Sequence, residues 1–472
     1  MIDNNSKQEA INILYSKVRQ YERTEFDVAH RYGDLPNQIL DTFKGLDYTV
    51  NADSTCYDRV SDTPQFKYWY LEIKFIDDKG EDNKIKGFIL ATGNGEPIKT
   101  GKDIISISGG VKFQKVKKGA RILIDDGKIS LEVEKRISNK TLLCKVLYDG
   151  VVKQRKGINF PGIELDLPSL TDQDKEDLQL ALSKDVDWIA LSFVRSPSDY
   201  KTIRDNIKKS GYNTPILAKI EKWEAVKNMN DIIDTFDAVM VARGDLGVEL
   251  PLEQVPGIQK KVIKKAIKAG KPVVLATQIL DSMTERPVPT RAEVSDIANA
   301  ILDGADALMV TGETAIGKHP LKVIKVLSRV IIETEQSINY KNFIKDISKK
   351  RLNTAQAISH AACSVASKQR INKIITMTHS GSTARMVSRY RPAAKIIAMT
   401  PFKETCRQLG IVWGVQPLLV KNYNTSEDIP LVSNEMLMIN KILRKNEKYV
   451  ITGGVPVGVP GTTNYLSVLK GV

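Results

Sequence analysis

Short apolar runs alternate with helix-like segments in the second half of the chain. Between the runs, segments such as 258–270 and 291–304 repeat apolar residues at helical spacing, and Gly304 is a typical helix C-cap. Fully apolar strands that alternate with helices predict a buried parallel sheet. Successive units that end in polar or glycine residues favour a (β/α)8 TIM barrel, in which reactive groups gather at the carboxyl ends of the strands. The apolar runs lie roughly 25 to 40 residues apart, at 187–194, 214–220, 238–244, 272–277 and 307–312.

Other regions of the chain follow different patterns. Residues 99–165 form short β-rich runs broken by Gly and Asp-Gly turns, which predicts a small all-β domain inserted into the barrel. Upstream, runs such as 85–92 have weak patterns that suit the first barrel strands. A basic linker around 343–352 precedes a further α/β unit. The expected organisation is a leader (1–21), a first barrel segment (22–98), the β-rich insert (99–165), a second barrel segment with the active site (166–342) and a C-terminal α/β domain (353–472).

Composition narrows the function classes for this chain of 472 residues. Its net charge of +14 is spread along the chain, which disfavours nucleic-acid binding and suits a small anionic substrate. No apolar run is long enough to span a membrane and no secretory signal precedes the first domain, so we expect a cytoplasmic protein without a membrane partner. Its four cysteines are widely spaced and its four histidines lack zinc-like spacing, which disfavours disulfides and a His-based metal site.

Polar residues stand at the carboxyl ends of successive predicted strands. Lys219 and Glu221 share one face of their strand, since residues i and i+2 point to the same side. Asp245, Thr277 and Glu313 follow the next strands. Two carboxylates without histidine suit Mg²⁺ (or Mn²⁺), and the lysine would stabilise negative charge on a substrate oxygen. The alternative is a buried ion pair of Lys219 with Glu221 or Asp245 that serves structure alone.

Several long motifs resemble the pyruvate kinase family: "ILAKIEKWEAV", "MVARGDLGVELPLEQV", "VVLATQILDSM", "RPVPTRAEVSDIANAILDGADALMVTGETAIGKHP" and "TGGVPVGVPGTTN". The resemblance implies phosphoryl transfer from phosphoenolpyruvate to ADP, giving pyruvate and ATP in glycolysis. It assigns Lys219 and Thr277 to catalysis and Glu221 and Asp245 to the metal. The resemblance places substrate binding at Lys219, Ala242, Arg243, Gly244, Asp245 and Thr277.

The same resemblance implies regulation and assembly. It identifies the β-rich insert, with "IDDG" at 124–127, as a mobile lid in the form of a small β-barrel, and "RPVPTRAEVSD" as a subunit contact of a homotetramer. The stretch "THSGSTARMVSRYRP" is similar to an effector loop for a sugar-phosphate or nucleotide. Its phosphate cradle would comprise Thr378, Ser380, Gly381, Ser382 and Thr383, although the same residues also suit an ordinary helix N-cap.

The N-terminal third departs from the family pattern. Where the family has Arg-x-Asn-x-Ser-His, an alignment through Gly45 gives Val50, Ala52 and Thr55 for the arginine, asparagine and histidine, and only Ser54 remains as a potassium ligand. A shift by one residue recovers Asn51 but places Thr49 at the arginine, so no register restores the arginine. Thr92 and Lys99 replace an aspartate and an arginine further on. Potassium binding is therefore doubtful. Three hypotheses follow: a divergent pyruvate kinase, a metal-dependent enzyme acting on the enolate of a 2-oxo acid without nucleotide-dependent transfer, and a non-catalytic metabolite-binding homologue.

Overall fold

The structure is a computed structural model, and it describes only some regions of the chain. It divides into two compact units, Met1–Ile89 with Lys99–Ile105, and Leu90–Ile98 with Ser106–Val472. In the first unit, β1 (Thr49–Asn51) pairs antiparallel with β2 (Glu72–Lys74). Most of the expected leader and of the first barrel segment, with Ser54 and Lys99, lies outside the described residues. Those residues are 49–51, 72–74, 87–92, 104–107, 111–148, 150, 152, 157–165, 168–338, 340, 352–459 and 461–472.

A six-stranded sheet corresponds to the expected β-rich insert. Its strand order is β4-β3-β7-β6-β5-β8. An Asp125-Asp126-Gly127 turn with positive φ at all three residues joins β5 to β6, and side chains such as Leu131 and Cys144 fill the interior. The strands are β3 (Gly87–Thr92), β4 (Ile104–Ile107), β5 (Arg121–Ile124), β6 (Ile129–Ser138), β7 (Thr141–Tyr148) and β8 (Ile158–Asn159).

The position of β3 differs from the sequence expectation. The pattern of the run 85–92 suits an early barrel strand, but β3 belongs to the β-rich sheet. A short apolar run has the same pattern in either kind of buried sheet, so periodicity alone does not select its partner strands.

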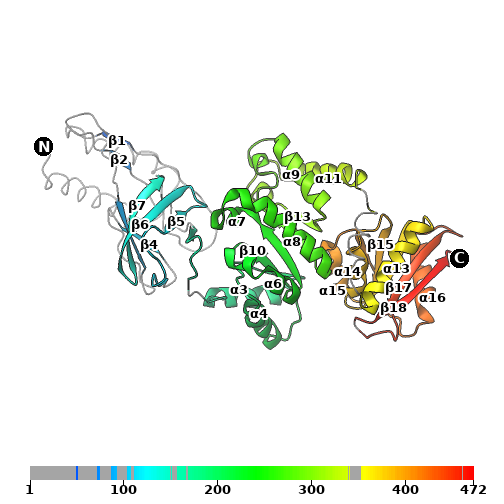
Figure 1. Ribbon diagram of the computed structural model, residues 1–472. Helices are drawn as coiled ribbons and strands as arrows, with labels where there is room; N and C mark the ends of the chain where they lie inside the picture. Colours follow the sequence, from blue (N-terminus) through cyan, green and yellow to red (C-terminus); the bar gives the residue numbers. More distant parts are fainter. Residues whose placement is uncertain are drawn as a thin grey trace, which may run out of the picture. The chain divides into compact units, whose positions relative to one another are not determined.

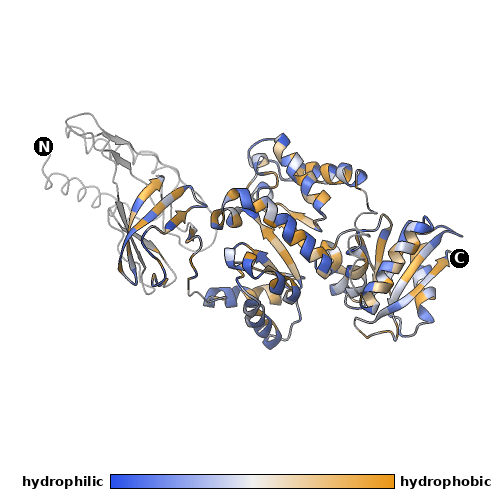
Figure 2. Cartoon of the chain, viewed as in Figure 1, coloured by the Kyte–Doolittle hydropathy of each residue, from blue (hydrophilic) through white to orange (hydrophobic). Residues whose placement is uncertain are grey.

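Five parallel strands form the described region of the barrel, in the order β13-β12-β11-β10-β9. All residues of β11 and β12 are buried, as strands covered on both faces require. Figure 1 shows these strands among helices, and Figure 2 shows that they are the more hydrophobic elements. The strands are β9 (Ile189–Leu191), β10 (Ile216–Ile220), β11 (Ala238–Ala242), β12 (Val273–Ala276) and β13 (Ala307–Met309).

Helices connect and follow these strands, and their ends obey local rules. Capping boxes begin α3 at Thr171 and α9 at Thr290, and left-handed glycines end α8 and α9 at Gly270 and Gly304. The helices are α3 (Asp172–Ser183), α4 (Pro197–Lys209), α5 (Trp223–Lys227), α6 (Met229–Thr235), α7 (Arg243–Glu249), α8 (Val255–Ala269), α9 (Arg291–Asp303), α10 (Gly312–Ala315) and α11 (Pro320–Gln336), with 3₁₀ turns η1 (Leu252–Gln254) and η2 (Asp281–Thr284).

The C-terminal domain is a second α/β layer structure. Its sheet has the order β16-β15-β14-β17-β18, parallel except for the antiparallel β17–β18 pair. Its strands are β14 (Lys373–Met377), β15 (Lys395–Thr400), β16 (Val415–Leu419), β17 (Lys448–Gly454) and β18 (Thr463–Lys470). Its helices are α13 (Thr354–Lys368), α14 (Ser382–Ser388), α15 (Lys403–Gln408) and α16 (Asp428–Ile439), with the 3₁₀ turn η3 (Leu409–Ile411).

A buried ion pair joins the C-terminal domain to the barrel. Arg391 Nη2 lies 2.9 Å from Asp306 Oδ2, and each side chain is 3% exposed. The Arg391 guanidinium also donates to the Ser388 and Gly304 carbonyls, and the backbone N–H groups of Val273 and Trp413 donate to Asp306. We call this arrangement the junction pair. Around it, one hydrophobic cluster includes side chains of both domains, such as Ile267 and Ala366.

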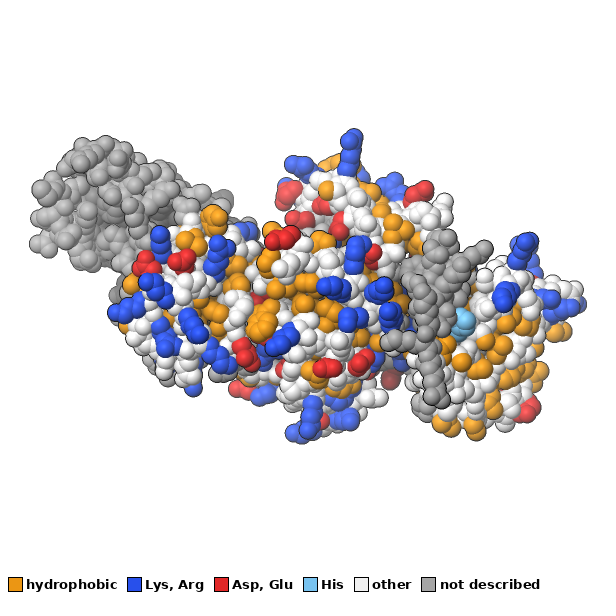
Figure 3. Space-filling view, in the orientation of Figure 1, with side chains coloured by type: hydrophobic (Ala, Val, Ile, Leu, Met, Phe, Trp, Pro, Cys, Tyr) orange, Lys and Arg blue, Asp and Glu red, His pale blue; other side chains and the backbone are white. Residues whose placement is uncertain are grey.

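The charge pattern of the described surface agrees with a dispersed net charge. Figure 3 shows Lys and Arg side chains scattered among acidic and hydrophobic ones on the face in view. No helix in the described ranges has both the length and the apolar character to cross a membrane.

Candidate active site

Lys219 and Glu221 lie together at the carboxyl end of β10. Lys219 Nζ is 2.7 Å from Glu221 Oε1 and donates to Ser192 Oγ at 2.9 Å. The Glu221 side chain is only 1% exposed, whereas that of Lys219 is 23% exposed. The pair is therefore buried on its carboxylate side and open on its ammonium side. We call it the site pair.

Asp245 joins this pair from the neighbouring strand. It stands in the first turn of α7, directly after β11, which pairs in parallel with β10. Burial raises the pKa of the Asp245 carboxyl, the Glu221 carboxylate raises it further, and Lys219 lowers it. Asp126, in the β5–β6 turn, also raises the pKa of Asp245. Two carboxylates therefore repel each other at one edge of the barrel sheet.

This donor set suits a hard divalent cation. A cation would relieve the repulsion between Glu221 and Asp245, and carboxylate oxygens are the ligands that Mg²⁺ prefers. Within the described residues, no three His, Cys, Asp or Glu side chains form a metal cluster. Two carboxylates would leave the remaining positions for water and for oxygens of an anionic substrate, which is the usual arrangement for Mg²⁺.

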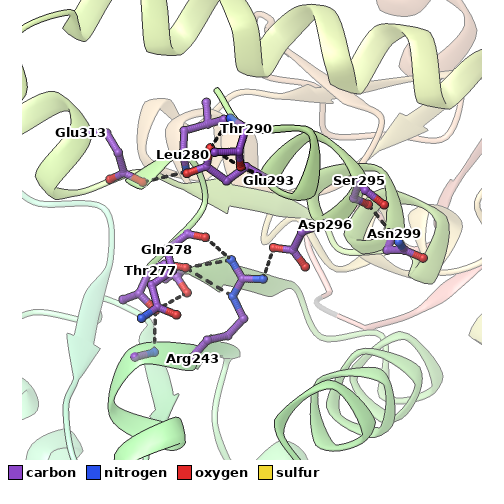
Figure 4. A network of polar contacts seen from close by, with 12 residues as sticks. Arg243, Thr277, Gln278, Leu280, Thr290, Glu293, Ser295, Asp296, Asn299 and Glu313 are labelled. Atoms are coloured by element: carbon purple, nitrogen blue, oxygen red, sulfur yellow. Dashed lines mark hydrogen bonds and ion pairs between the residues drawn. The ribbon is translucent and has the colours of Figure 1, made fainter. Parts of the chain in front are cut away.

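Thr277 lies in a constrained turn, beside the Arg243 side chain (Figure 4). Its hydroxyl accepts from the Gly244 backbone N–H at 2.8 Å. Thr277 and Gln278 have φ of 65° and 53°, a left-handed conformation that is costly for non-glycine residues. Arg243 donates to both of their carbonyls and forms an ion pair with Asp296. The Arg243 side chain therefore holds the turn, and only its backbone is available to a ligand.

The hydrogen bonds of Glu313 indicate a structural role and not a role in binding a ligand. Its carboxylate is 2% exposed and accepts from the backbone N–H groups of Leu280 and Thr311 at 3.0 and 2.9 Å. Glu293 similarly accepts from Ser282 and Thr290 at the start of α9. Figure 4 shows Glu313 beside Leu280 and Glu293 beside Thr290. Although Glu313 follows a strand as the sequence suggested, two backbone groups already occupy its oxygens.

The comparisons with known proteins agree with this arrangement. Residues 75–324 match the family "Pyruvate kinase, barrel domain", and residues 356–469 match "Pyruvate kinase, alpha/beta domain". The chain belongs to the pyruvate kinase family. It is 43% identical to pyruvate kinase 2 of Synechocystis sp. over 84% of this chain and 66% of that protein. It is 41% identical to the pyruvate kinase of Clostridium acetobutylicum over 80% of this chain and 82% of that protein.

A solved structure supports the same conclusion. A pyruvate kinase from Cryptosporidium parvum has a TM-score of 0.75 and 33% identity, over 82% of this chain and 79% of that one. The expected family and fold class, a barrel with an inserted β-rich domain and a C-terminal α/β domain, are thereby confirmed. Some relatives are longer: the chain spans 64% of the Sporosarcina psychrophila pyruvate kinase.

Two further groups at the site were not predicted from the sequence. Ser192 accepts from Lys219, and the backbone N–H of Phe193 donates to Glu221 Oε2 at 2.7 Å. Both residues directly follow β9, so the strand-end rule that selected Lys219 also applied to them. Serine and phenylalanine carry no charge, however, and only the fold shows that a backbone N–H there supports a carboxylate.

The residues expected to form an effector loop lie between the end of β14 and the first turn of α14. The Thr383 hydroxyl is buried and lies 2.9 Å from that of Thr463, and the buried Thr378 hydroxyl has no hydrogen-bond partner in the described part of the chain. The Ser380 hydroxyl donates to that of Ser382 at 3.3 Å. Gly381 precedes α14 with φ of 76°, a conformation that favours glycine. The serine hydroxyls are the more exposed members of this loop.

Proposed function

We propose that this chain transfers a phosphoryl group from phosphoenolpyruvate to ADP, giving pyruvate and ATP in glycolysis. The observation that carries the proposal is the convergence of Lys219, Glu221 and Asp245 at the ends of two adjacent parallel strands. Phosphoryl transfer relies on positioning and on cations around the transferring group, so one ammonium beside a two-carboxylate metal site suits this reaction.

The proposed roles follow from the surroundings of each residue. Glu221 and Asp245 would hold Mg²⁺ (or Mn²⁺), which supplies charge neutralisation for the substrate oxygens when bound. The open ammonium of Lys219 would stabilise negative charge on the enolate oxygen and the transferring phosphoryl group. Backbone N–H groups at 242–245, early in α7, would bind the substrate carboxylate. Thr277, held by Arg243, would lie beside the enolate carbon.

Potassium dependence is proposed to be weak or absent. The positions that match the family's arginine and potassium-binding asparagine are Val50 and Ala52, neither of which can bind a cation or a phosphate through its side chain. Lys99 supplies charge without the bidentate fork of arginine. Weaker transition-state stabilisation on the phosphate side is the expected consequence.

Assembly, regulation and location are further proposals from the family resemblance. We infer a cytoplasmic homotetramer with an allosteric effector that carries a phosphate, either a sugar-phosphate or a nucleotide. Its cradle would be Thr378, Ser380, Gly381, Ser382 and Thr383, with Ser380 and Ser382 as the accessible hydroxyl donors. Size-exclusion chromatography with light scattering, with and without a phosphorylated sugar, tests the assembly.

A coupled assay for pyruvate tests the proposed function. The protein is assayed with phosphoenolpyruvate, ADP and Mg²⁺, with and without K⁺, beside Asp245→Ala. We expect Mg²⁺-dependent turnover that K⁺ changes little and that Asp245→Ala abolishes. Absence of turnover would contradict the proposal. Proton exchange at the methyl group of pyruvate, lost in Lys219→Met, would then favour enolate chemistry without transfer, whereas its absence would favour a non-catalytic homologue.

A further inference from the structure

Glu249 is the centre of a buried polar network beside the candidate active site. It is 4% exposed and ends α7. Its Oε1 accepts from Asn159 Nδ2 at 2.9 Å and from the Lys222 ammonium. Its other carboxylate oxygen, Oε2, is buried without a hydrogen-bond partner among the residues that the structure describes. A single oxygen atom therefore receives both donors.

Asn159, Lys222 and Glu249 come from three segments of the chain, two of which also carry a proposed metal ligand. Asn159 ends β8, the last strand of the β-rich sheet before the chain enters the barrel. Lys222 directly follows the proposed metal ligand Glu221. Glu249 ends the short helix whose first turn holds Asp245. The network thus connects the end of the β-rich sheet with the segments that carry both proposed metal ligands.

Lys222 also contacts Phe193, the residue whose backbone N–H donates to Glu221. Its ammonium lies 5.7 Å from the centre of the Phe193 ring, a cation–π distance. The Phe193 backbone donates the hydrogen bond that orients Glu221, and its φ of 54° is a strained conformation for phenylalanine. Strain of this kind persists only where the surroundings hold it. Lys222 is one of the groups that contact the ring of Phe193, a residue that is 51% exposed.

The network is poorly explained as a stabilising element. Glu224 lies nearby, and it too has a buried oxygen without a partner. Burial raises the pKa of the Glu224 carboxyl, and Glu249 contributes in the same direction. Unpartnered buried polar atoms cost free energy, and buried ion pairs often stabilise a fold no more than apolar side chains of similar volume. Such a network beside the proposed metal ligands therefore calls for a functional explanation.

We propose that Asn159, Glu249 and Lys222 are positioning residues that couple the end of the β-rich sheet to the geometry of the metal ligands Glu221 and Asp245. The inference rests on the proposed metal site. With Asn159 in place, Glu249 shares its oxygen between two donors, and Lys222 stays over Phe193. Without the Asn159 donor, Glu249 depends on Lys222 alone, the ammonium shifts from the ring, and Glu221 loses its fixed orientation.

Direct Mn²⁺ binding, followed by electron paramagnetic resonance on the full chain without substrate, tests this coupling. Asn159→Ala removes one neutral donor to Glu249 and leaves every charge in place. Because groups behind metal ligands typically change metal affinity by about 10–100-fold, we expect this more distant change to raise the Mn²⁺ Kd about 3–10-fold. In the assay, the Mg²⁺ concentration for half-maximal rate should rise likewise.

Two further variants sharpen the test. If Glu249 carries the coupling, Asn159→Ala combined with Glu249→Gln should have the Mn²⁺ Kd of Glu249→Gln alone, because interacting residues do not add. Asn228→Ala is the matched control, since its side chain donates to the Arg195 carbonyl in the same half of the barrel without contacting Glu249. It should bind Mn²⁺ as the wild type does.

The outcomes separate this inference from the proposed function. An unchanged Kd in Asn159→Ala, or multiplied effects in the double variant, would overturn the coupling. Wild-type protein that binds Mn²⁺ but forms no pyruvate would refute the proposed function while the coupling is still decided by the binding data. If the wild type bound no Mn²⁺, both would be wrong.

Discussion

The junction pair and the site pair are two buried ion pairs with the same chemistry and different surroundings. At the junction, Arg391 and Asp306 are each 3% exposed, and backbone groups from both domains occupy most of their remaining hydrogen-bonding positions. At the site, Glu221 is buried while Lys219 is 23% exposed, and a second carboxylate, Asp245, adds uncompensated charge.

The difference shows that the number of hydrogen-bonding positions left open in a buried ion pair decides whether the pair can bind a ligand or serves the fold alone. In the described residues Arg391 Nε is buried without a hydrogen-bond partner, but both Nη atoms of Arg391 and both oxygens of Asp306 are occupied by groups of the protein. A buried ion pair of this kind has little left to offer a ligand. An ion pair with one open side and an excess of negative charge can bind a cation and an anionic substrate. The pKa of Asp245, raised by burial and by Glu221, is the electrostatic sign of that excess.

The largest expected effect comes from breaking the junction pair. Arg391→Met leaves Asp306 buried without its cation, so the free energy of unfolding should fall by about 3–5 kcal/mol. Turnover per folded molecule should be unchanged, because Arg391 is remote from the β10 strand end. Urea unfolding and the pyruvate assay measure the two quantities.

Lys260→Met is the control for the junction pair. It removes a more exposed ion pair with Asp303 and should change the free energy of unfolding by at most about 1 kcal/mol. If Arg391→Met unfolded like this control, the junction pair would not have the structural role assigned to it.

The next effect concerns the site pair. Lys219→Met removes the only cation that contacts Glu221 in the described residues, and kcat should fall by about 10²–10³-fold or more. Its unfolding midpoint should rise with Mg²⁺ more steeply than that of Arg391→Met, since in Lys219→Met a bound cation also replaces the lost ammonium charge, whereas Arg391→Met keeps the site pair intact. If Lys219→Met lost the same free energy of unfolding in Mg²⁺ as in EDTA, the site pair would not border a cation site.

The smallest effect tests a carboxylate with saturated hydrogen bonds close to the site. Burial opposes ionisation of Glu293, but hydrogen bonds from Ser282 and Thr290 prevail and lower its pKa. Glu293→Gln should cost about 0.3–1 kcal/mol of unfolding free energy at pH 7, a range that allows for solvent screening.

The pH dependence of that cost has a definite sign. A lowered folded-state pKa gives stability that is present above the unfolded value of about 4.3 and is lost as the pH falls through the folded value. Urea unfolding of the wild type and Glu293→Gln should show a smaller difference in unfolding free energy below pH 4 than at pH 7. A constant difference would mean that charge plays no role in this contact.

Local patterns account for much of the fold and of the site. Lys219, Glu221, Asp245 and Thr277 were selected from the sequence because parallel strands bring their carboxyl ends to one edge, and the position of a residue within its strand sets its side. The same rule also selected Glu313, whose oxygens are occupied by Leu280 and Thr311. A strand-end position specifies where a side chain lies, but not which partners already satisfy it.

The sequence by itself determined the strand–helix alternation, the residues at the strand ends and the motifs of the pyruvate kinase family, because these depend on neighbours within a few positions or on recurring stretches of chain. Only the tertiary structure decided that β3 joins the β-rich sheet, that Phe193 supports Glu221, and that Asn159 meets Glu249 across 90 positions. The physical reason is that hydrogen bonds and buried charges depend on which distant segments fold into contact, and residue spacing along the chain does not specify those contacts.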